Sequence, residues 1–180
     1  MAKIIIPDEN QRVESFPDVR DYLKTRGIVH DQWSVIPSAN GAADQQTVLD
    51  AYADILDPFM AAGGYATADV ISVGPETKGL AELRAKFLSE HTHSEDEVRF
   101  FVDGKGLFWF NPGDGNPVFA LLCQAGDLLS VPAEACHWFD LGDNPRVKAI
   151  RIFTDAAGWV AHYTGSGIDE RYNTLPGLWE

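Results

Sequence analysis

From His91 onward the sequence is a series of short apolar or alternating segments separated by turn residues, and this pattern restricts the possible folds more than any other feature. So many short strands within residues 91–154 predict a β-sandwich or a small barrel. Apolar residues on both faces of several segments suit strands enclosed between layers. The segments are EVRFFVDGKGLFWFN, expected to be a hairpin that turns at DGKG, followed by VFALLC, DLLSVP, ACHWFDL and RVKAIRIF.

Residues 1–90 have a different character, and helical periodicity predominates there. The segment 16–27 has acidic residues early, basic residues late and a glycine at its end, as expected of a short capped helix. Apolar residues recur at helical spacing in 44–56 and again in 79–90, whereas 68–74 is typical of a strand. The chain is therefore expected to be mainly β, with N-terminal helices flanking the strands.

Charge and cysteine content narrow the class of protein. The chain has 27 acidic and 14 basic side chains and a net charge of −13, which argues against nucleic acid or an anionic membrane as the main partner. Two cysteines are too few for a disulfide scaffold. We expect a soluble, cytoplasmic, monomeric protein with one domain over residues 1–180 and an irregular tail after Thr154.

The segment HTHSEDEVR contains a candidate metal site. Alternate side chains of a strand share a face, so an extended chain would point His91, His93 and Glu97 the same way. Imidazoles and a carboxylate suit a borderline divalent metal, and His137 on a later strand is a candidate fourth ligand. Four ligands leave two positions of a six-coordinate ion open, which is typical of a catalytic site. Alternatively, both early histidines are solvated residues at the exposed start of a strand.

The same segment resembles the first motif of the cupin superfamily, HxHxxxExxxxxxG, which here ends at Gly104. Gly126, Pro132 and His137 in GDLLSVPAEACH resemble the second cupin motif. Ala85, Glu134 and Leu141 depart from the motifs, where cupins have glycine, glycine and asparagine. These positions serve turns and strand packing, so the departures concern loop geometry more than the ligands. The resemblance implies a double-stranded β-helix, the jelly-roll barrel.

Within the cupins, HTHSEDEVRFFVDGKGLF is similar to the signature of the acireductone dioxygenase family, and the resemblance spans nearly the whole chain. It implies one Fe²⁺ or Ni²⁺ per chain, held by the four residues named above. It also implies oxidation of an acireductone by O₂ in methionine salvage. The iron form gives formate and 2-keto-4-methylthiobutyrate, and the nickel form gives formate, carbon monoxide and methylthiopropionate.

Charge supports a catalytic role for Arg99 once this substrate is assumed. A divalent metal and Glu97 together carry one positive charge, and the activated substrate of the family is a dianion. The guanidinium of Arg99 brings the assembly to neutrality in a dry pocket, where an unbalanced charge is costly. The resemblance likewise implies that Arg99 helps to generate the dianion. Alternatively, Arg99 pairs with Glu95 or Asp96 at the rim.

Five further residues are candidates for roles around the metal. Arg151 interrupts an apolar strand face, so it reaches substrate oxygens, orients a ligand carboxylate or forms a structural salt bridge. Phe139 is two residues after His137, so on a strand it lies on the same face and is a candidate pocket wall. Trp159 is a candidate cap over the mouth of the pocket. Glu90 and Asp96 are next to proposed ligands in the sequence, so on a strand their side chains would point away from the metal. The resemblance associates these two positions with metal incorporation and conformational change.

Other functions remain compatible with these residues. A cupin dioxygenase acting on another enediol or on a thiol needs the same ligands and a different pocket lining. A non-catalytic cupin that binds a metal or a sugar is a second alternative, and a cupin isomerase that does not use O₂ is a third. The two arginines at inward-facing positions, Arg99 and Arg151, argue against a purely structural metal site.

Overall fold

The computed structural model describes residues 1–41, 44–155 and 159–179, and its main feature is an 11-stranded antiparallel sheet. The predicted mainly β fold is confirmed. The strands are β1 (Lys3–Ile6), β2 (Gln11–Val13), β3 (Val29–Gln32), β4 (Thr67–Val73), β5 (His91–Thr92), β6 (Glu97–Phe110), β7 (Phe119–Gln124), β8 (Asp127–Val131), β9 (His137–Asp140), β10 (Arg146–Phe153) and β11 (His162–Tyr163).

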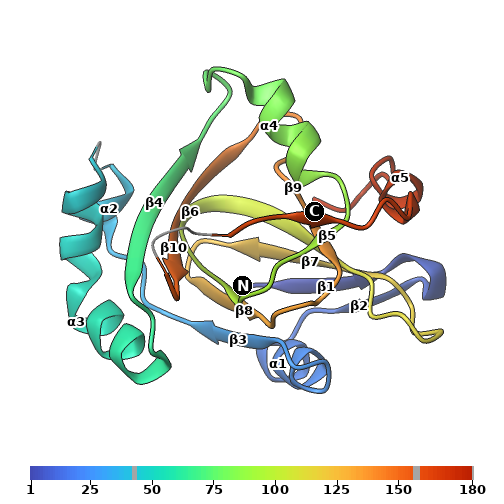
Figure 1. The fold of residues 1–180 in the computed structure, drawn as a ribbon, viewed down its shortest axis with the longest axis horizontal. Coiled ribbons are helices and arrows are strands. Elements are labelled where there is room, and N and C mark those ends of the chain that lie inside the picture. Colours follow the sequence, from blue (N-terminus) through green and yellow to red (C-terminus); the bar gives the residue numbers. More distant parts are fainter. Residues whose placement is uncertain (42–43, 156–158, 180) are drawn as a thin grey trace.

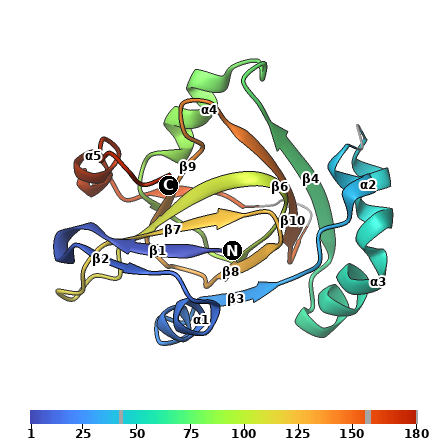
Figure 2. The same ribbon diagram turned by 180° about the vertical axis from the view of Figure 1, so that it is seen from behind.

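Short helices connect and flank the strands. The helices are η1 (Pro7–Glu9, a 3-10 helix), α1 (Phe16–Lys24), α2 (Pro37–Asn40), α3 (Gln45–Gly63), α4 (Leu80–Phe87) and α5 (Ile168–Tyr172). Helices α2 and α3 lie together outside β4, and α4 lies at another edge of the strands (Figures 1 and 2). Helix α5 lies near the C-terminal end of α4, where Nδ2 of Asn173 donates to the carbonyl oxygen of Leu88 at 3.1 Å. Within the described residues, no helix is long and apolar enough to cross a membrane.

Strand β6 organises the sheet, because its two halves pair with different neighbours. The first half pairs with β8 and β10, and the second half pairs with β7 and β9. The prediction of a simple hairpin over this segment is therefore wrong: the chain bends at DGKG, and each half bonds to other strands. A bulge opposite Lys148 and Ala149 and the positive φ of Gly104, +76°, produce the bend.

Gly104 should be intolerant of a side chain for two reasons. Its φ disfavours any L side chain, and an added Cβ would lie 1.7 Å from the carbonyl oxygen of Arg146 in β10. We expect Gly104→Ala to lower the free energy of unfolding by at least ~3 kcal/mol, measured by denaturant titration. Gly113→Ala is the matched control, because Gly113 has φ +71° with nothing within 4 Å of an added Cβ. Equal losses in the two variants would mean that the close approach of β10 is unimportant.

Alternation along the strands separates the two sides of the barrel wall. Side chains such as Phe101, Phe108 and Leu121 form the inner core, the largest of the three apolar clusters. Phe100 and Ile150 point to the opposite side, where the apolar face of α3 covers them. The long helix thus packs on the outside of β6 and β10 and leaves the inside free for the site.

Two expectations for the ends of the chain need correction. Residues 1–90 are not simply a helical preface, because β1, β2 and β3 join the sheet: β1 pairs with β7, and β3 pairs with β8. The tail after Thr154 is not wholly irregular, because it contains β11 and α5. These elements are too short to show a period in the sequence, and tertiary pairing stabilises them.

Candidate metal centre

Four side chains that the sequence singled out lie together at one end of the barrel interior. All four are buried, and their ligand atoms lie within 4.8 Å of one another. They come from β5, the residue that follows it, and the first residues of β6 and β9. This group, hereafter the His-Glu cluster, consists of His91, His93, Glu97 and His137.

The convergence does not arise from alternation along one strand. Strand β5 ends at Thr92, and residues 93–96 form a loop. The alternation of side chains along a strand therefore does not explain why His93 and Glu97 point the same way. Antiparallel pairing of β5 with β9 instead places His91 opposite His137. Tertiary pairing therefore assembles the cluster that the motif pattern predicted.

Each histidine is oriented by a hydrogen bond from Nδ1 to a backbone carbonyl oxygen, which leaves its Nε2 available to a metal. Nε2 of His93 and of His137 each lie 3.1 Å from Oε2 of Glu97. Three imidazoles and one carboxylate directed at a common point fit a borderline divalent metal. The Nδ1 partners are Ser89 for His91 (2.7 Å), Val160 for His93 (2.8 Å) and Ala135 for His137 (2.8 Å).

Ionisation in the metal-free site follows from burial and neighbouring charges. Burial tends to raise the pKa of Glu97, but Arg99 and the two hydrogen-bonded histidines hold that pKa well below its usual value. Burial, with His137 nearby, lowers the pKa of His91 to about 4. Burial also tends to lower the pKa of His93, but the hydrogen bond and charge of Glu97 outweigh it and raise that pKa.

Metal loading should therefore release a proton from His93 in mildly acidic solution. A protonated imidazole cannot bind a metal, so affinity should fall by up to about tenfold per pH unit below the pKa of His93 and level off above it. His91 stays neutral throughout this range. Calorimetric titration of metal-free protein with Ni²⁺, in two buffers of different ionisation enthalpy, counts the protons released at a series of pH values upward from about pH 6. A proton count that stays the same over the whole series would contradict this ionisation scheme.

Arg99 lies inside the barrel beside the cluster. It is 5% exposed, and its Nη2 lies 2.8 Å from Oε1 of Glu97. The guanidinium also lies over the ring of Phe139, with 4.6 Å to the centroid, and over that of Phe108, with 5.2 Å. Its Nε is buried without a hydrogen-bond partner among the described residues. The arginine thus pairs with the cluster carboxylate and not with the acidic residues of the rim.

The other pocket candidates surround this arginine. Arg151 lies opposite Arg99 in the sheet, but its guanidinium bonds to Asp69 at 2.8 and 2.5 Å, so the salt bridge that the sequence left open is present. Trp159 lies near the ring of His93, with 6.1 Å between centroids, and its Nε1 donates to the carbonyl oxygen of Asp96. Trp159 therefore covers the ligand loop, as a cap over the mouth would.

Glu90 and Asp96 connect the ligand loop to its surroundings. The buried Glu90 carboxylate accepts hydrogen bonds from Asn111 at 2.7 Å, from Ser166 at 2.5 Å and from Thr164. Oδ1 of Asp96 accepts from the backbone N–H of Ala133 at 2.9 Å. Both carboxylates are engaged away from the cluster, so they support the loop and do not take part in it.

Sequence reasoning missed the contribution of the C-terminal segment. The carbonyl oxygen of Val160 orients His93, Tyr163 pairs with His91 across β11 and β5, and Thr164 binds Glu90. A backbone carbonyl leaves no residue-type signal, and the polar tail resembles ordinary surface sequence. Phe108, which also faces Arg99, had no signal in the sequence, because alternation counted from Arg99 places it on the opposite face. The bulge in β6 reverses the alternation and turns Phe108 inward.

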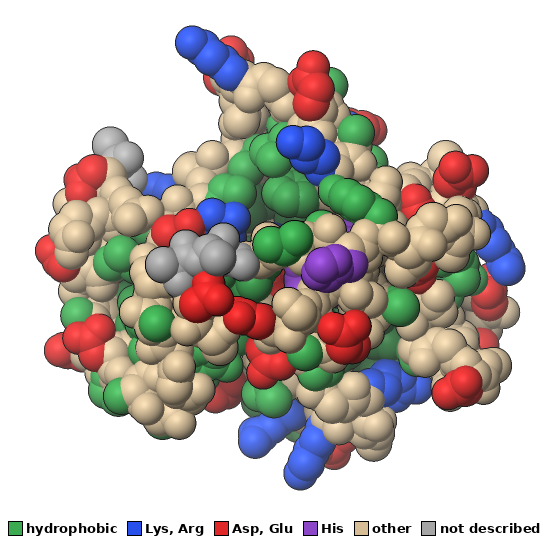
Figure 3. All heavy atoms as spheres, in the orientation of Figure 1, with side chains coloured by type: hydrophobic (Ala, Val, Ile, Leu, Met, Phe, Trp, Pro, Cys, Tyr) green, Lys and Arg blue, Asp and Glu red, His purple; other side chains and the backbone are tan. Residues whose placement is uncertain are grey.

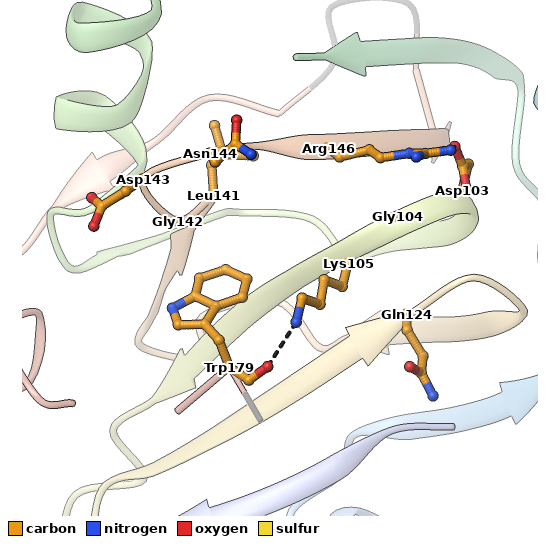
Figure 4. Close-up of a pocket in the computed structure, with 10 residues that line it drawn as sticks. All are labelled: Asp103, Gly104, Lys105, Gln124, Leu141, Gly142, Asp143, Asn144, Arg146 and Trp179. Atoms are coloured by element: carbon orange, nitrogen blue, oxygen red, sulfur yellow. Dashed lines mark hydrogen bonds and ion pairs between the residues drawn. The ribbon is translucent and has the colours of Figure 1, made fainter. Parts of the chain in front are cut away.

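A hollow lined with hydrophobic side chains opens beside α4, between β4 and β9 (Figure 3). Leu80, Leu83 and Phe87 of α4 and Ile71 of β4 pack against the inner core. A separate cavity of about 640 Å³ lies where β6 bends (Figure 4). Its lining includes none of the His-Glu cluster; it consists of Asp103, Gly104, Lys105, Gln124, Leu141, Gly142, Asp143, Asn144, Arg146 and Trp179.

Comparison with known proteins agrees with the geometry of the site. The model of the ARD/ARD' family matches residues 7–161. An acireductone dioxygenase of Picosynechococcus is 50% identical over 97% of this chain and 99% of its own. One from Methylococcus capsulatus is 52% identical over 83% of this chain and 79% of its own. Among solved structures, an acireductone dioxygenase of Bacillus anthracis with a cadmium ion in its active centre superposes on this chain with a TM-score of 0.83. The two are 36% identical, and the match covers 91% of this chain and 98% of the other.

Proposed function

The chain belongs to the ARD/ARD' family of acireductone dioxygenases, and from this premise we propose how its own residues carry out the reaction. It acts in methionine salvage as a metal-dependent dioxygenase that oxidises acireductone with O₂. The fold is that of the cupins, as predicted. The observation that carries the proposal is the buried His-Glu cluster, whose carboxylate forms an ion pair with Arg99.

The residues of the His-Glu cluster would hold one metal ion per chain, and we propose Fe²⁺ or Ni²⁺. When bound, the ion supplies a Lewis acid that binds the substrate oxygens and makes the reaction with O₂ accessible. A site of three histidines and one carboxylate binds Ni²⁺ more tightly than Fe²⁺, so occupancy should follow metal supply. With iron the expected products are formate and 2-keto-4-methylthiobutyrate, and with nickel they are formate, carbon monoxide and methylthiopropionate.

Arg99 would act on the substrate by charge. In a pocket that excludes water, its guanidinium stabilises the deprotonated enediol and so favours proton loss from the substrate. The rings of Phe139 and Phe108 hold the guanidinium in place and keep water away from it. Since Arg99 also forms an ion pair with Glu97, it would couple substrate binding to the orientation of a cluster carboxylate.

The remaining roles concern the walls and the tail. Phe139 and the hydrophobic hollow suit the methylthioalkyl chain of the substrate. Trp159 would exclude water at the mouth, and Arg151, held by Asp69, would contribute positive charge nearby. Glu90 and Asp96 would keep the ligand loop in its binding conformation through the bonds described above.

We also propose that residues 1–180 form one domain and that the protein is a monomer of the cytoplasm. Strands from both ends of the chain join one sheet, which supports a single domain. Two free cysteines, Cys123 and Cys136, agree with a reducing compartment.

The test is anaerobic reconstitution of metal-free protein with Fe²⁺ and, separately, with Ni²⁺. O₂ uptake and products are then followed with acireductone. Uptake with a 2-oxo acid from the iron form and carbon monoxide from the nickel form would support the proposal. Full metal occupancy without uptake would overturn it and move the function to another cupin chemistry, such as oxidation of a different enediol or isomerisation.

A further inference from the structure

Helix α4 closes a gap in the barrel wall. Among the described strands, β4 pairs with β10, and β9 pairs with β5 and β6, so β4 and β9 do not pair with each other. Helix α4 follows β4 in the chain and lies between these two strands (Figures 1 and 2). Its apolar side chains Leu80, Leu83 and Phe87 pack against the inner core. The helix is therefore a wall of the barrel interior beside the hydrophobic hollow (Figure 3).

This helix has little intrinsic support. It has eight residues, its N-cap Gly79 makes no side-chain capping bond, and none of its residues is fully buried. An isolated helix of two turns is unstable in water, so contacts with the rest of the protein must hold it in place. The position of α4 should consequently depend on its contacts with neighbouring elements, which include hydrogen bonds from Tyr163 and Asn173 to its C-terminal end.

Arg84 supplies a contact of this kind, to the strand that carries a proposed ligand. Its Nη2 lies 3.4 Å from Oδ1 of Asp140, the last residue of β9, and its Nη1 lies 3.3 Å from Oδ1 of Asp143. The Asp140 side chain is only 11% exposed and also accepts the backbone N–H of Gly142 at 2.8 Å. Water screens a pair at this burial less than it screens a surface pair.

The same helix and strand meet again at the site. Phe87, three residues after Arg84, meets the ring of Phe139 edge-on, with 6.1 Å between centroids. Phe139 in turn lies 4.6 Å from the guanidinium of Arg99. The pair Arg84–Asp140 and the aromatic contact thus fasten α4 to β9 at two points, and the second point borders the proposed substrate pocket.

We propose that Arg84 is a positioning residue: its ion pair with Asp140 holds α4 across the gap between β4 and β9 and so sets the wall that contacts the alkyl chain of the substrate. The inference rests on the proposed function for its substrate. Without the pair, α4 moves more freely, and the apolar chain loses contacts that it makes equally in the ground state and in the transition state. Such a loss raises KM and leaves kcat nearly unchanged.

The test compares Arg84→Gln, Arg84→Lys, Asp140→Asn and the double variant in metal-loaded protein. Hydrogen exchange of the α4 amides reports on the helix without any need for turnover. Exchange and KM should each rise roughly three- to fivefold in Arg84→Gln, the factor that a partly exposed ion pair supplies. Arg84→Lys should restore part of both, and the effects of Arg84→Gln and Asp140→Asn should be less than additive in the double variant.

Substrate choice gives a second readout. The KM of an acireductone with a shorter alkyl chain should change less than that of the methylthio substrate, because the short chain makes fewer contacts with the wall. Arg146→Gln is the control, since Arg146 is 79% exposed and pairs with Asp103 in the other cavity (Figure 4). Unchanged exchange in α4, unchanged KM, or loss of metal from Arg84→Gln would each overturn the proposal. Absence of turnover in the unmodified holoenzyme would instead count against the proposed function.

Discussion

Replacing His93 by alanine should remove the metal and the activity together. His93 would bind the metal through Nε2, because its Nδ1 is hydrogen-bonded to the carbonyl oxygen of Val160. Alanine has no side-chain atom that could replace this ligand. A site reduced to three ligands loses both affinity and geometry. We expect turnover to fall by roughly three orders of magnitude or more, because a Lewis acid contributes several kcal/mol to the transition state. Glu97→Ala should behave in the same way.

Metal content by elemental analysis, measured beside O₂ uptake, checks this result. His162→Ala is the matched control, because His162 is an exposed histidine of β11, which pairs with β5 beside the site, and it lies outside the His-Glu cluster. It should keep its metal and its activity. A metal-replete but inactive His93→Ala protein would contradict the ligand assignment.

Replacing Arg99 by alanine should keep the metal and remove turnover. The three histidines stay in place, since they are oriented by backbone carbonyls and not by Arg99. Glu97 loses its ion pair with Arg99 but keeps the contacts of its Oε2 with His93 and His137. The substrate anion, however, loses its buried positive partner. Loss of one preorganised charge of this kind lowers kcat by about 10²–10³.

The Arg99 experiment needs a readout that separates charge from packing. Arg99→Lys retains a cation without the planar fork that reaches Glu97 and lies over Phe139, so it should recover part of kcat. The pH dependence of kcat should also shift toward higher pH in Arg99→Ala, because the enediol then loses its proton less readily. Loss of metal from Arg99→Ala would show that the arginine acts through Glu97 alone.

The fold and the site differ in how much of them could be predicted. The mainly β class followed from the density of short strands, and the helices at 44–56 and 79–90 were detectable from their periodicity. The bend in β6 was not, because DGKG has the composition of a hairpin turn. The two halves of β6 do not pair with each other, because each pairs with two other strands: β8 and β10 for the first half, β7 and β9 for the second. These pairings depend on the tertiary structure.

The sequence by itself determined which donor types are present and in what spacing, because HxHxxxE and a later histidine on a strand are encoded residue by residue. It also determined the net charge of −13, which disfavours nucleic acid or an anionic membrane as the main partner. Tertiary structure decided which partners these side chains have. Strand pairing places His137 opposite His91, and the carbonyl oxygen of Val160 accepts a hydrogen bond from His93. Asp69 forms an ion pair with Arg151, and Asp140 forms one with Arg84. These are contacts between residues far apart in the chain, and backbone carbonyls and ion-pair choices depend on distances that no local pattern records.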